Sequence, residues 1–341
     1  MHRKLNRRTS YPIKEGVLAT PVIETEGLTK IFGRLRNPKL AVDHIHFRVE
    51  PGQVYGFLGP NGAGKSTTIR MMLNLMHASD GKTLIFGEDP RKKPDILFRV
   101  GSLVEGATFY PYLRGWDNLK VVGNSRGGFD PTRAKQLLQF VGLVGSERVR
   151  VKAYSTGMKQ RLGIAAALLN NPDLVILDEP TNGMDPAGIR EMRQFIRDLA
   201  YKYGKTVFLT SHLLSEVQQT SDRVAIINRG KIVVEGLIEE LLNQEEQLEA
   251  EVGSIEKAKT ALQERWQVAA STVPNEHNKL RIKASRNDTP SIVRRLVEQN
   301  VDVFSIAPVR QSLEEYFLEV IGDDSVQPNS SPLPIGGTPH A

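Results

Sequence analysis

Nine consecutive residues, GPNGAGKST from Gly59 to Thr67, have the composition of a phosphate-binding loop. They fit the pattern G-x-x-x-x-G-K-[ST] and stand between a predicted strand and a predicted helix, which is the context that this pattern requires. Glycines let the backbone wrap around phosphate groups, the Lys65 ammonium neutralises the β and γ phosphates, and the Ser66 hydroxyl can ligate Mg²⁺. The predicted nucleotide-binding residues of the loop are Gly59, Pro60, Asn61, Gly62, Ala63, Gly64, Lys65, Ser66 and Thr67.

Two adjacent carboxylates end a short apolar run further along the chain. LVILDEP, residues 174–180, is typical of a buried strand that finishes in Asp178 and Glu179. Asp178 suits the shell of a magnesium ion, and Glu179 suits the polarisation of an attacking water. Two acids at a strand end are commonly only solvated, but a phosphate loop in the same chain favours the catalytic interpretation.

A second apolar run, TVFLTSH, repeats this geometry on another predicted strand and ends in His212. The imidazole can donate a hydrogen bond to the γ-phosphate, although a single histidine is usually structural. We therefore count His212 as a candidate catalytic residue together with Lys65 and Glu179.

A second anion cradle is predicted about ninety residues after the first. YSTGM, residues 154–158, precedes KQRLGIAAALL, which has the pattern of a helix. Ser155 and Gly157 stand at the N-terminus of that helix, where free backbone N–H groups and the helix dipole favour negative charge. Since the chain already has a phosphate loop, the ligand of this second cradle is an open question.

The elements around these residues predict an α/β fold. Residues 22–58 alternate as strands do, residues 65–76 have helical spacing, and residues 107–170 are mostly helical in pattern. The two apolar runs that end in candidate residues are then separated by a predicted helix. Strands joined by helical crossovers predict a parallel sheet with its site at the carboxyl ends of the strands.

The pattern changes after about residue 243, where short strands and two helices predict a small α+β accessory domain. Thr289 and Pro290 are the predicted N-cap and first residue of one helix, and SLEE at 312–315 predicts a capping box. The last residues are rich in proline, glycine and serine and are expected to be disordered. The predicted parts are a basic flexible tail at 1–21, a catalytic domain at 22–243 with a helical subdomain at about 107–170, the accessory domain at 244–322, and a disordered tail at 323–341.

Composition limits the classes of function. The chain has 341 residues and a formal net charge of +6, but the first twenty residues hold five basic residues and one acidic residue, so the rest is nearly balanced. This distribution does not predict a nucleic-acid groove; it favours a solvated tail, with contact to anionic lipid as the alternative. There is no cysteine, the histidines form no ligand cluster, and no apolar window approaches the ~18 residues of a membrane span.

These motifs together predict a P-loop NTPase. A GTPase is disfavoured because the guanine motif Asn-Lys-x-Asp is missing, whereas a small-molecule kinase stays open on the phosphate loop alone. The order of the motifs is more specific: phosphate loop, Glu105, YSTGMKQR, LDEP, NGMD and His212. This order resembles the nucleotide-binding subunit of ABC transporters over residues 22 to about 240. The ending QSLEEYFLEVIG is similar to the tail of bacitracin- and lantibiotic-resistance-type export ATPases.

The resemblance implies a fold and roles for further residues. It implies an ABC ATPase core with a parallel sheet, an antiparallel β-subdomain and a helical subdomain, with ATP and Mg²⁺ as ligands. Phe32 would stack on adenine, and Glu105 would join Ser66 and Asp178 as a metal ligand. The residues that would take the place of the family's signature, and would contact the nucleotide of a partner subunit, are Ser155, Thr156, Gly157 and Met158.

The resemblance also implies partners. In this family two nucleotide-binding subunits pack head to tail, so the second cradle would serve the ATP of the other subunit, here expected to be a second copy of this chain. The pair would drive a polytopic membrane permease and would lie at the cytoplasmic face of the membrane, held there by the permease. No nucleic acid is expected as a partner.

Two departures from the family pattern leave alternatives open. The signature has Thr156 and Met158 where Gly and Gln are usual, and Glu105 stands where Gln is usual, so one hydrogen-bond donor is lost. Both features recur in the bacitracin and lantibiotic branch, which favours an active subunit over a degenerate one. The alternatives are a soluble ABC ATPase that acts on ribosomes or DNA and a regulatory subunit that binds ATP without turnover.

Overall fold

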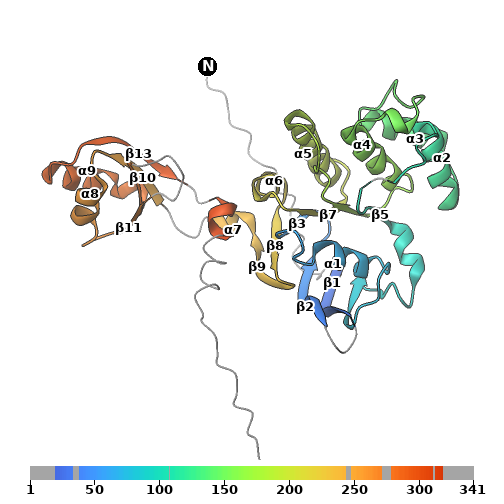
Figure 1. Ribbon diagram of the computed structural model, residues 1–341, viewed down its shortest axis with the longest axis horizontal. Helices are drawn as coiled ribbons and strands as arrows, with labels where there is room; N and C mark the ends of the chain where they lie inside the picture. The colour runs from blue at the N-terminus through green and yellow to red at the C-terminus, as the bar shows by residue number, and fades with distance from the viewer. Residues whose placement is uncertain are drawn as a thin grey trace, which may run out of the picture.

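The computed structural model describes three sheets and the helices that pack on them (Figure 1). The predicted N-terminal tail, except for its last two residues, and all of the predicted C-terminal tail lie outside the described residues. No helix among the residues described is long and apolar enough to cross a membrane. The described residues are 20–33, 38–106, 108–242, 247–270, 278–309 and 312–317.

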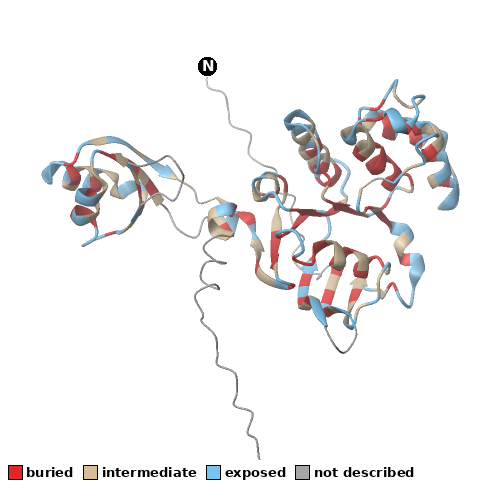
Figure 2. Cartoon of the chain, in the orientation of Figure 1, coloured by how far each residue is buried: buried red, intermediate tan, exposed pale blue. Residues whose placement is uncertain are grey.

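A six-stranded sheet forms the centre of the N-terminal part of the chain, and its buried strands stand out in Figure 2. Its strands are parallel except for the last one at an edge. Three of them, β3, β6 and β7, are buried at every position, as their uninterrupted apolar runs predict. In order across the sheet the strands are β5 (Val100–Leu103), β6 (Leu174–Asp178), β7 (Thr206–Ser211), β3 (Val54–Leu58), β8 (Arg223–Asn228) and β9 (Lys231–Leu237).

The two faces of this sheet belong to different hydrophobic clusters. One cluster includes Tyr55 and Phe57 of β3 with Ile69 and Met72 of α1 (Lys65–Met72), together with residues of the antiparallel sheet. The other includes Val54 and Leu58 of the same strand with residues of the helices α5 (Pro186–Tyr201) and α6 (Leu214–Thr220). Side chains of a strand alternate between faces, so β3 joins both cores.

The smaller sheet of the N-terminal part is antiparallel, with β1 (Ile23–Phe32) between β2 (Lys39–Val49) and β4 (Asp80–Ile85). It is fixed to the central sheet by aromatic packing: Phe47 of β2 stacks on Tyr55 and Phe208 with ring centroids 5.7 and 5.8 Å apart. The expected antiparallel β-subdomain is therefore present.

The region predicted to be helical contains three α-helices. The first residue of α3 follows an N-cap, Asp130, whose carboxylate accepts the N–H groups of Thr132 and Arg133, with Pro131 in the first turn. The elements between β5 and β6 are α2 (Gly115–Ser125), α3 (Pro131–Phe140), a 3₁₀ turn η2 (Val151–Ala153) and α4 (Thr156–Ala167); a further 3₁₀ turn, η1 (Pro94–Arg99), precedes β5.

The C-terminal part has its own sheet and core. Across the sheet its strands lie in the order β11, β12, β10, β13, and all neighbours are antiparallel. Along the chain, one helix follows β10 and another follows β12. This β-α-β-β-α-β order is the ferredoxin-like arrangement. A separate hydrophobic cluster, which includes Leu248, Leu280 and Leu296, lies between the sheet and the helices. The elements are α7 (Ile238–Leu242), which precedes them, β10 (Gln247–Val252), α8 (Ile255–Leu262), β11 (Gln267–Ala270), β12 (Lys279–Lys283), η3 (Arg286–Asp288), α9 (Thr289–Glu298) and β13 (Val303–Val309).

Of the two capping predictions in this part, one is wrong and one is confirmed. Thr289 is not an N-cap: its backbone is helical, and the capping box forms one turn earlier, where Ser285 and Asp288 bond each other's backbone N–H groups around η3. The hydroxyl of Ser285 provides the acceptor one turn before the expected position. The second capping box is present, because Ser312 and Glu315 each accept the other's N–H ahead of the helical residues 313–317.

Candidate functional site

The glycines of the phosphate loop are required by its backbone path. Gly64 has φ +115° and is the N-cap of α1, and a Cβ there would stand 2.6 Å from the carbonyl oxygen of Ala41 in β2. The loop is also held from the side of β8 and β9, since Gly230 donates its N–H to the Ala63 carbonyl at 3.0 Å. No side chain caps α1 at its N-terminus, so the N–H groups of its first turn are directed into the loop, as phosphate binding requires.

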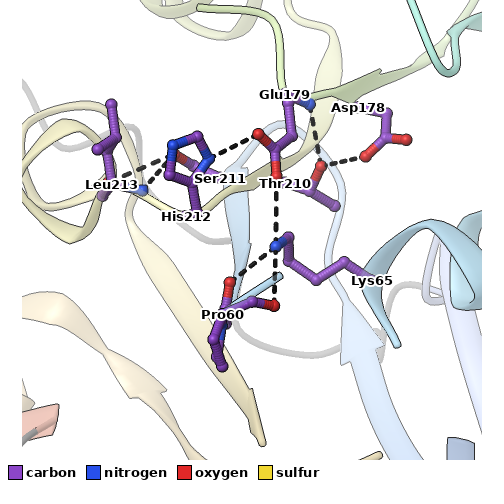
Figure 3. Close-up of polar contacts among 9 residues, drawn as sticks. Pro60, Lys65, Asp178, Glu179, Thr210, Ser211, His212 and Leu213 are labelled. Carbon is purple, nitrogen blue, oxygen red and sulfur yellow. Dashed lines mark hydrogen bonds and ion pairs between the residues drawn. The ribbon is translucent and has the colours of Figure 1, made fainter. Parts of the chain in front are cut away.

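Lys65 lies inside this loop and is almost fully buried, with 5% of its surface exposed. Its ammonium donates to the carbonyl oxygens of Gly59 at 2.7 Å and Pro60 at 3.3 Å (Figure 3). It also forms an ion pair with Glu179, with Nζ and Oε1 3.3 Å apart. The cation therefore stands between the loop backbone and the carboxylate that follows β6.

Glu179 joins the phosphate loop to the histidine that directly follows the neighbouring strand, β7. While one carboxylate oxygen pairs with Lys65, Oε2 lies 2.6 Å from Nδ1 of His212 (Figure 3). Its backbone has φ +48°, a left-handed conformation that non-glycine residues seldom adopt and that is found at functional sites. The three candidate catalytic residues are thus in one connected group.

Asp178 precedes Glu179 and points the other way, into the protein, with 5% of its surface exposed. Its Oδ1 accepts a 2.6 Å hydrogen bond from the Thr210 hydroxyl, and that hydroxyl oxygen accepts the Glu179 N–H at 3.0 Å. Sequence reasoning did not select Thr210. The signal that could have found it is a hydroxyl residue near the end of a strand that is buried throughout and adjacent to the strand bearing the acids.

The predicted metal ligands are all oxygen donors, but they are not equally placed. Ser66 lies in the first turn of α1, and the second oxygen of the buried Asp178 carboxylate has no hydrogen bond to the residues that the structure describes. Glu105 has φ +57° and forms an ion pair with Arg70, which lies one helical turn after Ser66. A hydroxyl and a carboxylate match the oxygen preference of Mg²⁺, whereas Glu105 would first have to leave Arg70.

The signature residues form a regular helix start. Ser155 is the N-cap of α4, and its Oγ accepts the N–H of Met158 at 3.2 Å, while Thr156 is the first helical residue. Ser155 and Thr156 are exposed. Gly183 of the NGMD loop has φ +72°, and a Cβ there would stand 3.1 Å from the Thr156 side chain. The signature therefore packs on the loop after Glu179, while Figure 1 places α4 away from α1 and its phosphate loop.

Phe32 is the last residue of β1, and 38% of its surface is exposed. The ammonium of Lys30 lies 5.3 Å from the centre of its ring. An exposed aromatic ring beside a cation is a suitable stacking surface for a base. The residues that follow, 34–37, are outside the described part of the chain.

The chain is similar to known proteins both in sequence and in fold. A family model described as "ABC transporter" matches residues 42–182. The bacitracin transport ATP-binding protein of Bacillus licheniformis is 39% identical over 307 residues, which are 89% of this chain and 99% of that protein. A lantibiotic transport ATP-binding protein of Streptococcus pyogenes is 38% identical over 63% of this chain and 90% of its own length.

Solved structures share the fold of the ATP-binding part. An ATP-binding cassette captured as a dimer with ADP and phosphate matches with a TM-score of 0.59 at 21% identity, over 63% of this chain and 98% of the cassette. A CbiO subunit from Clostridium perfringens, part of an ABC transporter complex, matches with a TM-score of 0.58 at 22% identity, over 65% of this chain and 90% of that subunit. At these identities the likeness shows the fold.

Proposed function

Since the chain belongs to the ABC transporter family as an ATP-binding subunit that hydrolyses ATP, we propose that it powers a separate membrane permease of an export system. The observation that carries the proposal is the connected group of Lys65, Glu179 and His212 at the phosphate loop. The similarity of this chain to a bacitracin transport subunit supports export, because the alignment of 307 residues extends beyond the ATP-binding part into the accessory part.

The residues at the phosphate loop have separate roles in this proposal. The backbone N–H groups of the loop and the Lys65 ammonium hold the β and γ phosphates, and Phe32 stacks on the adenine. Lys65 exchanges the Glu179 carboxylate for phosphate oxygens when ATP arrives, which releases Glu179. Glu179 then accepts a proton from the attacking water, while His212 donates a hydrogen bond toward the γ-phosphate.

Ser66 and Asp178 would hold Mg²⁺, and Glu105 would add a third ligand after parting from Arg70. The bound cation supplies neutralisation of the charge that spreads over the phosphate oxygens. Thr210 keeps one oxygen of Asp178 occupied, and the other oxygen would be the metal ligand.

The second cradle completes the site of another subunit. Ser155, Thr156, Gly157 and Met158 would contact the γ-phosphate held by the phosphate loop of a second copy of this chain. This answers why the chain has two anion cradles. The dimer would form with ATP between the copies and would separate after hydrolysis, and this motion would drive the permease at the cytoplasmic face of the membrane.

We propose the accessory domain as residues 244–322, after a catalytic domain at 22–243 whose helical subdomain spans about 107–170. A separate sheet and a separate hydrophobic cluster support this division. The basic tail at 1–21 and the terminal tail at 323–341 stay predictions from composition.

A trapped dimer tests the arrangement. Glu179→Gln should lower kcat roughly 10²–10⁴-fold, because the proton acceptor is lost, while ATP still binds. With ATP and Mg²⁺ this variant should elute as a dimer. Adding Ser155→Arg should prevent the dimer but leave one ATP bound per chain, since a bulky cation would fill the cradle and not the phosphate loop.

Ser291→Arg, an exposed serine of α9, is the matched control and should leave the trapped dimer unchanged. If the Ser155→Arg variant dimerises as well as its parent, the cradle does not serve a partner. Co-purification of the tagged protein with a polytopic membrane protein tests the coupling to a permease. Recovery with ribosomes or DNA instead would contradict it.

A further inference from the structure

The helical residues 313–317 follow the C-terminal sheet along the chain, but they pack against the ATP-binding part. Leu313 is fully buried in the cluster that includes Val217 of α6 and Leu241 of α7. Tyr316 and Phe317 pack against the same cluster. The cluster of the C-terminal sheet itself does not include Leu313. The segment therefore connects the end of the C-terminal part to the ATP-binding part.

A hydrogen bond fixes this segment to α6. The N–H of Leu313 donates to the side-chain oxygen of Gln218 at 3.0 Å, across 95 positions of sequence. This N–H is in the first turn of the short helix, where no intrahelical acceptor exists, so Gln218 satisfies a group that would otherwise be unpaired. The hydrogen bond to Gln218 thus fixes where the segment lies on α6, which apolar packing alone would not do.

An ion pair fixes the same segment to the C-terminal sheet. Glu315 accepts from Nη2 of Arg281 on β12 at 2.5 Å, and both side chains are largely buried, with 21% of Glu315 and 17% of Arg281 exposed. The capping box with Ser312 holds the Glu315 carboxylate in place. Arg281, with this capping box, keeps the pKa of Glu315 below its ordinary value. One turn of helix is thereby attached on one side to α6 and on the other to the C-terminal sheet.

The helix α6 is in direct continuity with the catalytic histidine. It begins at Leu214, two residues after His212, and the Leu213 N–H donates to Ser211 Oγ at 2.9 Å. On its other side α6 is held to α5, through an ion pair of Arg193 with Glu216. Val217 of α6 is buried in the same cluster as Val54 and Leu58 of β3, so α6 also packs on the central sheet. Its position therefore depends on the sheet, on α5 and on the segment 312–317, and His212 follows the position of α6.

We propose that residues 312–317 form a latch through which the C-terminal domain sets the position of His212, with Gln218 as the positioning residue. The proposal rests on the role of His212 given under Proposed function. When the latch is seated, α6 holds His212 beside Glu179; when the C-terminal domain moves and Leu313 leaves Gln218, α6 loses this contact and shifts, and hydrolysis slows. The C-terminal domain is then a regulator of turnover.

The test uses the full chain and compares Gln218→Leu with Gln218→Glu. The first removes the acceptor of the Leu313 N–H, whereas the second keeps an acceptor oxygen at this position, now that of a carboxylate. We expect Gln218→Leu to lower kcat about fivefold, the change expected for one lost hydrogen bond, with KM for ATP within about twofold of wild type. Gln218→Glu should recover most of kcat. Gln139→Leu, an exposed glutamine of α3, is the matched control and should leave kcat unchanged.

Urea unfolding of each variant shows whether the chain stays folded at the assay temperature. Equal kcat for Gln218→Leu and wild type would overturn the latch. So would a loss that appears only as a higher KM, since that is a defect in binding. Arg281→Met should lower kcat in the same direction, and Arg281→Lys should lower it less, because the positive charge beside Glu315 is kept.

The background variant His212→Ala separates the two proposals. If the latch acts through His212, Gln218→Leu should have no further effect on kcat in that background. A full fivefold loss in both backgrounds would mean a general structural role and would overturn the latch. If His212→Ala alone keeps the wild-type kcat, the role of His212 under Proposed function is wrong; if it lowers kcat and Gln218→Leu does not, only the latch is wrong.

Discussion

The Thr210 hydroxyl donates a 2.6 Å hydrogen bond to Oδ1 of Asp178, the carboxylate at the end of the neighbouring strand. The hydroxyl oxygen of Thr210 in turn accepts the N–H of Glu179 at 3.0 Å. One hydroxyl therefore orients the proposed metal ligand and stabilises the left-handed backbone of the proposed general base. Because Asp178 ends the adjacent strand and Glu179 directly follows it, the hydroxyl acts as a fixed part of the sheet.

Replacing this threonine by valine removes the hydroxyl and keeps the shape. We expect Thr210→Val to lower the free energy of unfolding by about 1–3 kcal/mol, since a buried carboxylate and an N–H lose their partner. ATP hydrolysis should fall as well, because Asp178 is free to turn. Urea unfolding and kcat at saturating ATP measure the two effects, and Thr210→Ser, which keeps the hydroxyl, is the control. Wild-type values for the valine variant would show that this hydroxyl orients neither acid.

Removing the cation of the phosphate loop should abolish tight ATP binding. Lys65→Ala deletes an ammonium that is buried among carbonyl oxygens and placed for the phosphates. Charge-assisted hydrogen bonds contribute about 1.5–3 kcal/mol each, so the ATP affinity in an equilibrium titration should fall at least about tenfold. Lys202→Ala, at the exposed C-cap of α5, is the control. Unchanged affinity in the Lys65 variant would contradict the assignment of the loop.

The exposed ring of Phe32 should contribute to ATP affinity through the adenine base and not through the phosphates. Phe32→Ala should weaken ATP binding by ~1–3 kcal/mol, the range for a base stacked on an aromatic side chain. Binding of tripolyphosphate, which has no base, should stay the same. The matched control is Phe304→Ala, which removes an exposed phenylalanine of β13. An equal loss for ATP and for tripolyphosphate would rule out the stacking role.

The ion pair of the latch predicts a dependence of stability on pH. Arg281, followed by the capping bonds from Ser312, holds the pKa of Glu315 below its ordinary value of 4.5. A carboxyl with a lowered pKa in the folded state stabilises the protein above its unfolded pKa, and this contribution is lost as the pH falls through the folded one. The difference in free energy of unfolding between wild type and Glu315→Gln should thus be largest above pH 4.5 and should shrink below it.

Glu314→Gln removes the exposed neighbouring carboxylate, which has no bond to Arg281 among those described, and serves as the control for that measurement. Urea unfolding at a series of pH values from neutral to acid gives the difference for both variants. A difference for Glu315→Gln that stays constant as the pH falls would contradict the ion pair.

The features that the sequence determined are those that a short stretch of chain specifies by itself. The phosphate loop is one, because only glycine tolerates both the φ of +115° at Gly64 and the nearness of the Ala41 carbonyl. The position of Asp178 and Glu179 at the end of a buried strand is another, since an uninterrupted apolar run before two acids can hardly be placed otherwise. The N-cap at Ser155 is local in the same way.

Capping at Thr289 shows how local signals compete. Both Ser285 and Thr289 are acceptable caps by residue type, and Pro290 would be the first helical residue after a cap at Thr289. In the structure Ser285 caps the 3₁₀ turn η3, which leads directly into α9, and its capping box with Asp288 satisfies two backbone N–H groups at once. Residue type alone does not distinguish the two.

Only the tertiary structure decided which of these residues meet. Glu179 and His212 are 33 positions apart and meet because each directly follows one of two neighbouring strands. The pairing of Glu179 with Lys65 depends on how β6 and the phosphate loop come together across the sheet. Likewise, Leu313 reaches Gln218 across 95 positions of sequence. Periodicity and residue type indicate which face of an element is buried, but they do not indicate which other element packs against that face. Long-range contacts of this kind follow from the packing of whole elements, in which each pair is selected by the shape and charge of everything around it.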